Sequence, residues 1–133
     1  MAPELVEGKG YGQEVDYWSL GVILYTMLCG YPPFYDENNQ KLFKMIVNLE
    51  YDFGSPYWDN ISETAKDLIR HLLTKDPSER YDAEAILNHP WFSGETPSTE
   101  LTTVPDQMKQ YIARKRLKKA THTIMAVGRL KKL

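Results

Sequence analysis

The chain has 133 residues, 42% of them hydrophobic, which is enough for one modest domain with a core and a tail. Its formal net charge of −2 hides an uneven distribution, because all 18 acidic residues lie at or before Asp106 together with only 7 of the 16 lysines and arginines. The remaining 9 basic residues follow position 106, and no acid accompanies them. An acidic body joined to a basic tail predicts attraction between the tail and an acidic partner, or between the tail and its own body.

Cys29 is the only cysteine, so a disulfide framework within the chain is excluded and a reducing cytoplasm or nucleus is the expected location. The first residues do not resemble a secretory or transit signal. The longest uncharged apolar stretch, from Tyr17 to about Gly30, is too short to span a bilayer. It predicts a buried core helix instead.

That first helix carries apolar residues on every face, so we expect protein to surround it. Two prolines, Pro32 and Pro33, predict its end, because neither can continue the helical hydrogen bonds. A second helix is predicted at about 39–49, where Leu42, Met45, Ile46 and Leu49 follow the spacing of one buried face. The loop-forming composition of residues 51–60 predicts an ordered loop.

Ser62 is the expected N-cap of a third helix, since its hydroxyl can accept a hydrogen bond from a free backbone amide. Asp82 is the expected cap of a short fourth helix that ends before His89. Residues 93–106 are rich in Ser, Gly, Thr and Pro and predict a linker, and residues 107–133 predict a final helix. No segment predicts a strand, so the expected fold class is all-α.

Five short motifs occur in a characteristic order and spacing over residues 1–92: Ala2-Pro3-Glu4, Asp16-Tyr17-Trp18-Ser19-Leu20-Gly21, Gly30-Tyr31-Pro32-Pro33-Phe34, Asp76-Pro77-Ser78-Glu79-Arg80 and His89-Pro90-Trp91. Together they resemble the C-terminal lobe of a Ser/Thr protein kinase. The run from Ser55 to Asp67 is most similar to the type I and type IV calcium/calmodulin-dependent kinases. The resemblance implies a partial kinase domain at 1–92, a linker at 93–106 and an autoinhibitory, calmodulin-binding segment at 107–133.

The resemblance also implies structural roles for four residues of the body. Glu4 and Arg80 would form an ion pair, although their spacing alone favours two ordinary solvated charges. Asp16 opens the apolar helix, where a short carboxylate favours an N-cap, and by resemblance it would also accept backbone amides from a catalytic-loop turn. Trp18 of the same motif is expected to be structural.

Phosphoryl transfer needs a Gly-rich loop, a strand lysine, a catalytic-loop Asp and Asn, and an Asp-Phe-Gly that binds Mg²⁺. Only the last has a match, Asp52-Phe53-Gly54, and it lies downstream of Ala2-Pro3-Glu4, where the family has it upstream. His71, His89 and His122 are scattered along the sequence without neighbouring ligands. We therefore predict no catalytic, cofactor-binding or metal-binding residue here, and expect ATP and Mg²⁺ to belong to a longer parent kinase of which this chain is the C-terminal part.

The tail favours a calmodulin-binding helix on physical grounds. Leu117, Ile124 and Leu130 have the 1-8-14 spacing of anchors for the two calmodulin lobes. Ala120 and Val127 complete the apolar face, and the basic residues beside it include Arg116, Lys118 and Lys119. From Ile112 onward the tail resembles the calmodulin-binding helix of the type I kinases, except that Leu117 stands where the family usually has a bulky aromatic residue.

Three functions remain open at this point. The first is the regulatory part of a calcium/calmodulin-controlled Ser/Thr kinase, with Ca²⁺-loaded calmodulin and the protein substrates of the parent as partners. The second is a non-catalytic calmodulin-binding or scaffold fragment. The third is a tail that lies on anionic lipid, or simply packs on its own lobe. No nucleic-acid partner is expected, and membrane binding is the weaker alternative.

Overall fold

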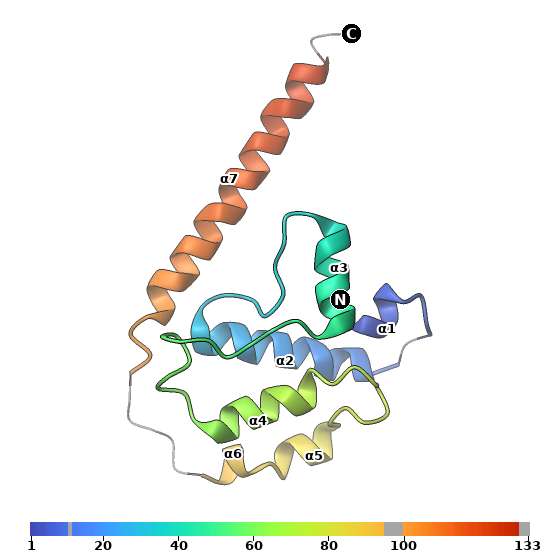
Figure 1. Cartoon of the computed structure of the whole chain (residues 1–133), viewed down its shortest axis with the longest axis vertical. Helices are drawn as coiled ribbons and strands as arrows, with labels where there is room; N and C mark the ends of the chain where they lie inside the picture. The colour runs from blue at the N-terminus through green and yellow to red at the C-terminus, as the bar shows by residue number, and fades with distance from the viewer. Residues whose placement is uncertain (11, 95–99, 131–133) are drawn as a thin grey trace.

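The computed structural model describes residues 1–10, 12–94 and 100–130, and in the last helix it leaves out the side chains of residues 120, 122–124 and 126–130. Within these residues the chain is helical and contains no strand, which confirms the all-α class. The helices are α1 (Pro3–Val6), α2 (Glu14–Cys29), α3 (Asn39–Asn48), α4 (Glu63–Leu72), α5 (Ala83–Leu87), α6 (Pro90–Ser93) and α7 (Val104–Leu130). Figure 1 shows α1 to α6 together as a body, from which α7 projects as a long arm.

Helix α2 lies at the centre of the body and packs along α4 (Figure 1). The two helices approach most closely at Gly21, where an added Cβ would lie 2.8 Å from the Cβ of Leu72 and 3.0 Å from a methyl carbon of Leu73. Only glycine leaves room for this crossing. Around it, Leu68, Ile69, Leu72 and Leu73 of the α4 region are fully buried. The crossing of α2 and α4 therefore forms the main core.

Local sequence signals set the ends of three helices. Ser62 accepts a hydrogen bond from the backbone N–H of Ala65 at 3.2 Å, and Asp82 accepts one from Ala85 at 2.9 Å, so both predicted caps are confirmed. Asn38 caps α3 by accepting from the N–H groups of Gln40 and Lys41. These side chains satisfy amides that have no partner inside the helix.

An aromatic cluster fastens the predicted loop at 51–60 against α2. The Tyr25 ring lies 4.6 Å from that of Trp58, and Phe53 contacts Trp58 at the same centroid distance. The Tyr25 hydroxyl donates to the backbone oxygen of Asp52 at 2.7 Å, and burial raises the pKa of this phenol. Trp18 stacks on Phe34 at 5.7 Å and thereby packs the α2–α3 connection onto the same helix. These contacts order two long connections that contain no regular secondary structure.

Helix α2 is not surrounded by protein on every side, contrary to the expectation from its apolar faces. Leu20, Ile23 and Met27 are 42%, 54% and 65% exposed. With the exposed carboxylate of Asp16 they follow a 4-3-4 spacing along one face of the helix. We call these four residues the α2 stripe. No other described element covers it, so this apolar face is open to solvent in the 133-residue chain.

The boundaries differ from the sequence-based ones at four places. Helix α2 starts at Glu14, three residues before the uncharged run, and the Ala2-Pro3-Glu4 motif forms the first turn of α1. His89 caps a further short helix, α6, where an end was expected. Helix α7 begins at Val104, inside the expected linker, because Pro105 in its first turn needs no intrahelical N–H bond. None of the described helices has both the length and the hydropathy needed to cross a bilayer.

Because the α2 stripe is open to solvent, polar substitutions in it should reduce hydrophobic association without changing the stability of the fold. Ile23→Gln and Met27→Gln should reduce binding of a hydrophobic dye and reduce aggregation, because each removes exposed apolar surface. Each should change the free energy of unfolding by no more than about 0.5 kcal/mol, as is usual for exposed positions. Urea titrations followed by circular dichroism and dye fluorescence measure the two effects.

Ile69→Ala is the control, because Ile69 is fully buried and its truncation should cost about 2–5 kcal/mol. A stability loss of similar size in Met27→Gln would show that the stripe is covered in solution.

Candidate functional site

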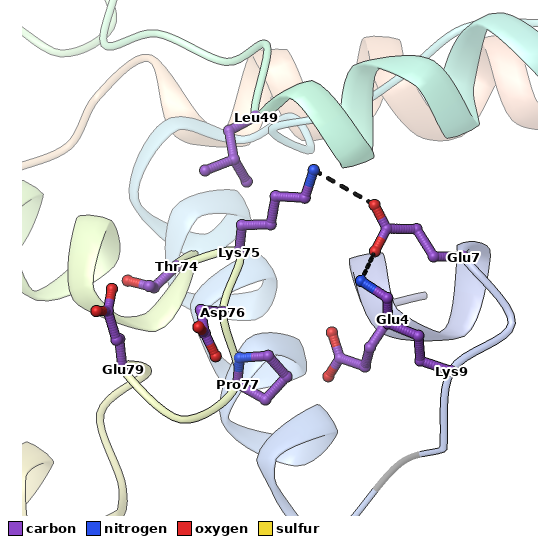
Figure 2. A pocket seen from close by; sticks show the side chains of 9 residues that line it. All are labelled: Glu4, Glu7, Lys9, Leu49, Thr74, Lys75, Asp76, Pro77 and Glu79. Carbon is purple, nitrogen blue, oxygen red and sulfur yellow. Dashed lines mark hydrogen bonds and ion pairs between the residues drawn. The ribbon is translucent and has the colours of Figure 1, made fainter.

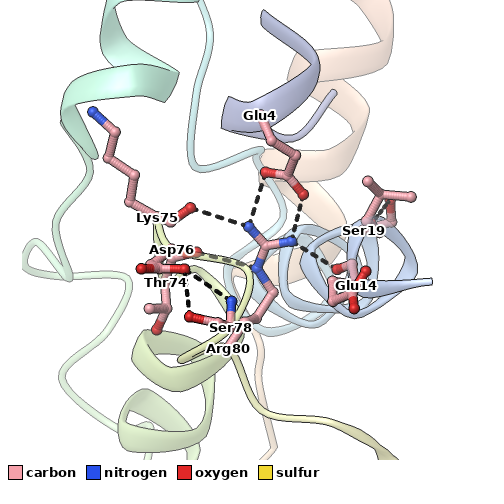
Figure 3. A network of polar contacts seen from close by, with 9 residues as sticks. Glu4, Glu14, Ser19, Thr74, Lys75, Asp76, Ser78 and Arg80 are labelled. Carbon is pink, nitrogen blue, oxygen red and sulfur yellow. Dashed lines mark hydrogen bonds and ion pairs between the residues drawn. The ribbon is translucent and has the colours of Figure 1, made fainter. Parts of the chain in front are cut away.

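Arg80 lies in the connection between α4 and α5 and is the most highly bonded side chain of the body (Figure 3). Its two terminal nitrogens donate to the two carboxylate oxygens of Glu4, at 2.8 and 3.0 Å. The other donations go to backbone oxygens: Nε to Thr74 at 3.1 Å, Nη1 to Glu14 at 2.7 Å and Nη2 to Lys75 at 3.4 Å. All five N–H donors of the guanidinium are thereby used.

The Glu4–Arg80 pair is withdrawn from water, with the two side chains 4% and 0% exposed. Trp18 lies beneath it, with the guanidinium carbon 5.3 Å from the ring centroid. Burial alone would raise the pKa of Glu4, but the hydrogen bond and charge of Arg80 outweigh it, so the pKa of Glu4 lies below its ordinary value. The pair joins α1, the start of α2 and the loop after α4. It is a structural tie rather than a reactive group.

A cavity of about 640 Å³ opens beside this pair, and Figure 2 shows the side chains around it. Glu7 bridges two lysines there, at 2.6 Å to Lys9 and 3.3 Å to Lys75. Hydrogen bonds from Lys9 and Lys75 lower the pKa of Glu7. Because the carboxylates of Glu4 and Glu7 are both held by cations, neither is placed to bind a metal ion or to exchange a proton with a ligand.

The fold brings together three residues that the sequence analysis did not connect. The Oδ2 atom of Asp67 lies 2.9 Å from Nε2 of His89 and 3.3 Å from Nδ1 of His71. The hydrogen bond with His89 is the main cause that lowers the pKa of Asp67. Sequence reasoning missed this cluster. The i, i+4 spacing of Asp67 and His71 was its only local signal. His89 lies elsewhere in the sequence, at the N-cap of α6.

This cluster has the composition of a metal site but not the proton arrangement of one. Nδ1 of His89 accepts the backbone N–H of Trp91 at 3.1 Å, so a neutral His89 carries its proton on Nε2 and donates it to Asp67. The lone pair that a metal would need at Nε2 is therefore absent. The cluster instead ties the start of α6 to α4.

Helix α7 is attached to the body near its beginning. Gly30 ends α2 with φ of 91°, and a Cβ there would lie 2.7 Å from both the Gln107 Cβ and the Val104 backbone oxygen. Farther along, Tyr111 meets Tyr35 edge to face at 5.9 Å, and Lys118 donates to the backbone oxygen of Glu37 at 3.4 Å. These contacts place the basic tail over the α2–α3 connection, an arrangement that no local sequence signal predicted.

The predicted calmodulin-binding residues lie in the half of α7 that points away from the body (Figure 1). Leu117 is 67% exposed, Arg116 and Lys119 are exposed, and Lys118 is half-buried by its contact with the α2–α3 connection. The side chains of Ala120, Ile124, Val127 and Leu130 lie outside the described ones. Their backbone is helical as far as Leu130, through Gly128.

Asp16 does not cap α2, so that prediction is wrong. The helix begins at Glu14 with Gln13 at the cap position, and Asp16 sits within the first turn. Because the helix starts three residues earlier than a cap at Asp16 would require, the Asp16 side chain lies in the first turn, where it is exposed. No hydrogen bond to it comes from the described residues.

The described loop that holds Asp52-Phe53-Gly54 does not fit a nucleotide or Mg²⁺ site. In the Asp52-Phe53-Gly54 match, Phe53 is packed between Trp58 and the guanidinium of Arg70, which lies 4.9 Å from its ring centroid. The backbone oxygen of Asp52 is occupied by Tyr25. The tripeptide therefore has a packing role in the loop after α3.

Comparison with known proteins decides the family. The model of the protein kinase domain matches residues 1–92, which comprise α1 to α5 and most of α6. The chain belongs to the protein kinase family.

Relatives match the whole length of this kinase chain, α7 included. It is 47% identical over 135 aligned positions to human calcium/calmodulin-dependent protein kinase type 1B, covering 100% of this chain and 39% of the relative. It is equally similar to the type 1 kinases of Macrobrachium nipponense and Caenorhabditis briggsae, with 98% and 100% of this chain and 39% and 38% of the relatives covered. The chain thus corresponds to the C-terminal part of such kinases and spans about two fifths of their length.

The buried ion pair predicts a large loss of stability when either partner is neutralised. Glu4→Gln and Arg80→Gln should each lower the free energy of unfolding by about 3–5 kcal/mol, because each leaves a buried charge without its counter-charge. Urea unfolding followed by circular dichroism measures the loss, which would show as a missing helical signal in buffer if it exceeds the total stability. Glu63→Gln is the matched control, since Glu63 is 78% exposed in its pair with Lys66 and should contribute about 0–1 kcal/mol.

The stability difference between the parent chain and Glu4→Gln should depend on pH. Because the folded-state pKa of Glu4 is below its ordinary value of 4.5, the ionised carboxylate stabilises the fold at any pH above 4.5. This contribution should fade as the pH falls from 4.5 through the folded-state pKa, until the two proteins differ little. Unfolding titrations between pH 7 and pH 3 measure it, and a difference that grows on acidification would contradict the assignment.

Proposed function

We propose that this chain is the regulatory C-terminal part of a Ca²⁺/calmodulin-controlled Ser/Thr kinase. The whole kinase would transfer the γ-phosphoryl group of ATP, with Mg²⁺, to hydroxyl groups of protein substrates. The observation that carries the proposal is the similarity to type 1 kinases along the entire chain, tail included. The body supplies the helical base, and α7 supplies the segment that calmodulin would bind.

The α2 stripe supports the first half of this proposal. It combines an open apolar ridge with the carboxylate of Asp16, and such a surface in a soluble protein normally contacts other protein. The relatives are more than twice as long as this chain. We propose that in a whole kinase the stripe packs against the part of the domain that holds the catalytic loop.

The position of α7 supports the second half. Its basic residues have no acidic neighbours in sequence after Asp106, and Leu117 is exposed instead of packed on the body. An acidic partner with hydrophobic grooves could therefore bind this segment without unfolding the core. Contacts at Gly30, Tyr111 and Lys118 hold α7 over the α2–α3 connection from its start to its middle. In the absence of calmodulin this placement would cover the connection, and calmodulin would withdraw it.

We further propose a cytoplasmic or nuclear location. The single cysteine supports it, because Cys29 is fully buried and burial raises the pKa of its thiol to about 11. Such a thiol has little thiolate at neutral pH and is a poor candidate for a disulfide.

Binding of calmodulin to the whole chain tests the proposed regulation. We expect binding in Ca²⁺ and release in chelator, because only Ca²⁺-loaded lobes expose hydrophobic grooves. Leu117→Ala and Leu130→Ala should each weaken binding by about 2–3 kcal/mol if these side chains are buried anchors. Leu117→Ala should leave the stability of the chain unchanged, since the side chain is exposed in the free chain. Titration calorimetry measures the affinities.

Ile112→Ala is the matched control, because Ile112 is exposed on the same helix but lies outside the 1-8-14 set. Replacing Lys118 and Lys119 by Gln should mainly slow association, since charges at the rim of an interface steer more than they hold. A lipid-binding tail would behave in the opposite way: anionic vesicles would suffice, charge replacement would dominate and Ca²⁺ would be irrelevant. Equal calmodulin binding with and without Ca²⁺ would refute the regulatory assignment.

A further inference from the structure

A cavity of about 270 Å³ lies where α7 meets the body. Three of its walls come from the body: Tyr31 and Tyr35 of the α2–α3 connection, and Tyr57 of the loop after α3. The fourth comes from α7, which contributes Tyr111 and Arg114. The cavity therefore exists only while α7 is docked against the body.

Four of the eight residues that line the cavity are tyrosines. Tyr31 and Tyr57 meet edge to face at 5.6 Å, and Tyr35 and Tyr111 do so at 5.9 Å. Ring faces and edges of this kind bind another flat aromatic ring well. The volume lies just below the usual range of about 300–1,000 Å³ for drug-sized ligands, so a ligand with a single ring is the appropriate size.

The charge of the residues that line the cavity indicates which polar group the ligand carries. Arg114 is exposed on α7, forms no ion pair with a described carboxylate, and no Asp or Glu lines the cavity. Burial raises the pKa of Tyr31, so its hydroxyl keeps its proton near neutral pH and can donate a hydrogen bond. Arg114 and Tyr31 line the same cavity. Together they offer a guanidinium and a phenol donor to a carboxylate, to which guanidinium groups form strong charge-assisted bonds.

We propose that this cavity binds a small aromatic carboxylate, with the ring among Tyr31, Tyr35, Tyr57 and Tyr111 and the carboxylate on Arg114. Because the walls come from both sides of the junction, the ligand binds the docked form of α7 and not the released form. A partner that removes α7 from the body must then compete with the ligand, and the competition is reciprocal. This last consequence rests on the proposed calmodulin binding, whereas the ligand site itself does not.

The binding test uses the full chain and 4-hydroxyphenylacetate as the probe, with the neutral 4-hydroxyphenylacetamide as its matched analogue. Ligand-detected NMR titration should show saturable binding of the acid and clearly weaker binding of the amide. Arg114→Gln should weaken binding of the acid about tenfold, as expected for one lost charge-assisted hydrogen bond. Tyr35→Ala should weaken binding of both probes, because it removes a wall. Circular dichroism verifies that each variant keeps its helical content.

Lys109→Gln is the control, because it removes one positive charge from the same helix outside the cavity. The site is refuted if the acid does not bind, if the amide binds as well as the acid, or if Lys109→Gln weakens binding as much as Arg114→Gln does.

Calmodulin titrations with and without saturating acid test the coupling separately. Weaker calmodulin binding in the presence of the acid, abolished in Arg114→Gln, supports the coupling. Unchanged calmodulin affinity with the ligand bound would overturn the coupling and leave the site intact. If calmodulin does not bind at all, the proposed function fails while the NMR titration still decides the site.

Discussion

The body of this chain depends on one buried guanidinium. Arg80 uses each of its five donors, and the acceptors belong to α1, the start of α2 and the loop after α4. A lysine could not replace it, because an ammonium has three donors and no planar fork for a carboxylate. Removing two charges from water is costly, and such pairs often contribute less net stability than apolar groups of the same volume. The pair therefore matters chiefly because it permits one arrangement of these segments and penalises others.

Helix α2 contacts other parts of the chain on several sides. One side meets α4 at Gly21, another holds Trp18 and Tyr25 in the aromatic cluster, and its last turn supports α7 at Gly30. A helix used on so many sides has no single polar face, so its sequence shows no amphipathic period. The same property explains why the α2 stripe could not be anticipated. Apolar residues all round a helix indicate that each side contacts something in the complete fold, but they do not indicate which sides this chain can cover.

Two cap predictions that rest on neighbouring residues are confirmed, whereas contacts between distant residues could not be predicted from local patterns. Ser62 and Asp82 cap their helices because a cap needs only the next three residues. Glu4 and Arg80 are 76 positions apart, and only the resemblance to kinases linked them. The cluster of Asp67, His71 and His89 was not predicted, because His89 is distant from the other two in sequence. Asp16 shows the limit of local rules, because the helix starts three residues earlier than a cap at Asp16 would require and the residue lies in the first turn instead.

The attachment of α7 has a strength suited to a reversible contact. Among the described contacts are close packing at Gly30, an edge-to-face pair of tyrosines and a long hydrogen bond from Lys118. An aromatic pair contributes about 0.5–1.5 kcal/mol beyond its buried area, and a long hydrogen bond from a half-buried lysine adds little. A binding partner can shift such an equilibrium only by its differential affinity for the released helix. Because the attachment is weak, a modest preference for the free helix suffices. The Glu4–Arg80 tie joins α1, the start of α2 and the loop after α4, so it remains intact when α7 moves.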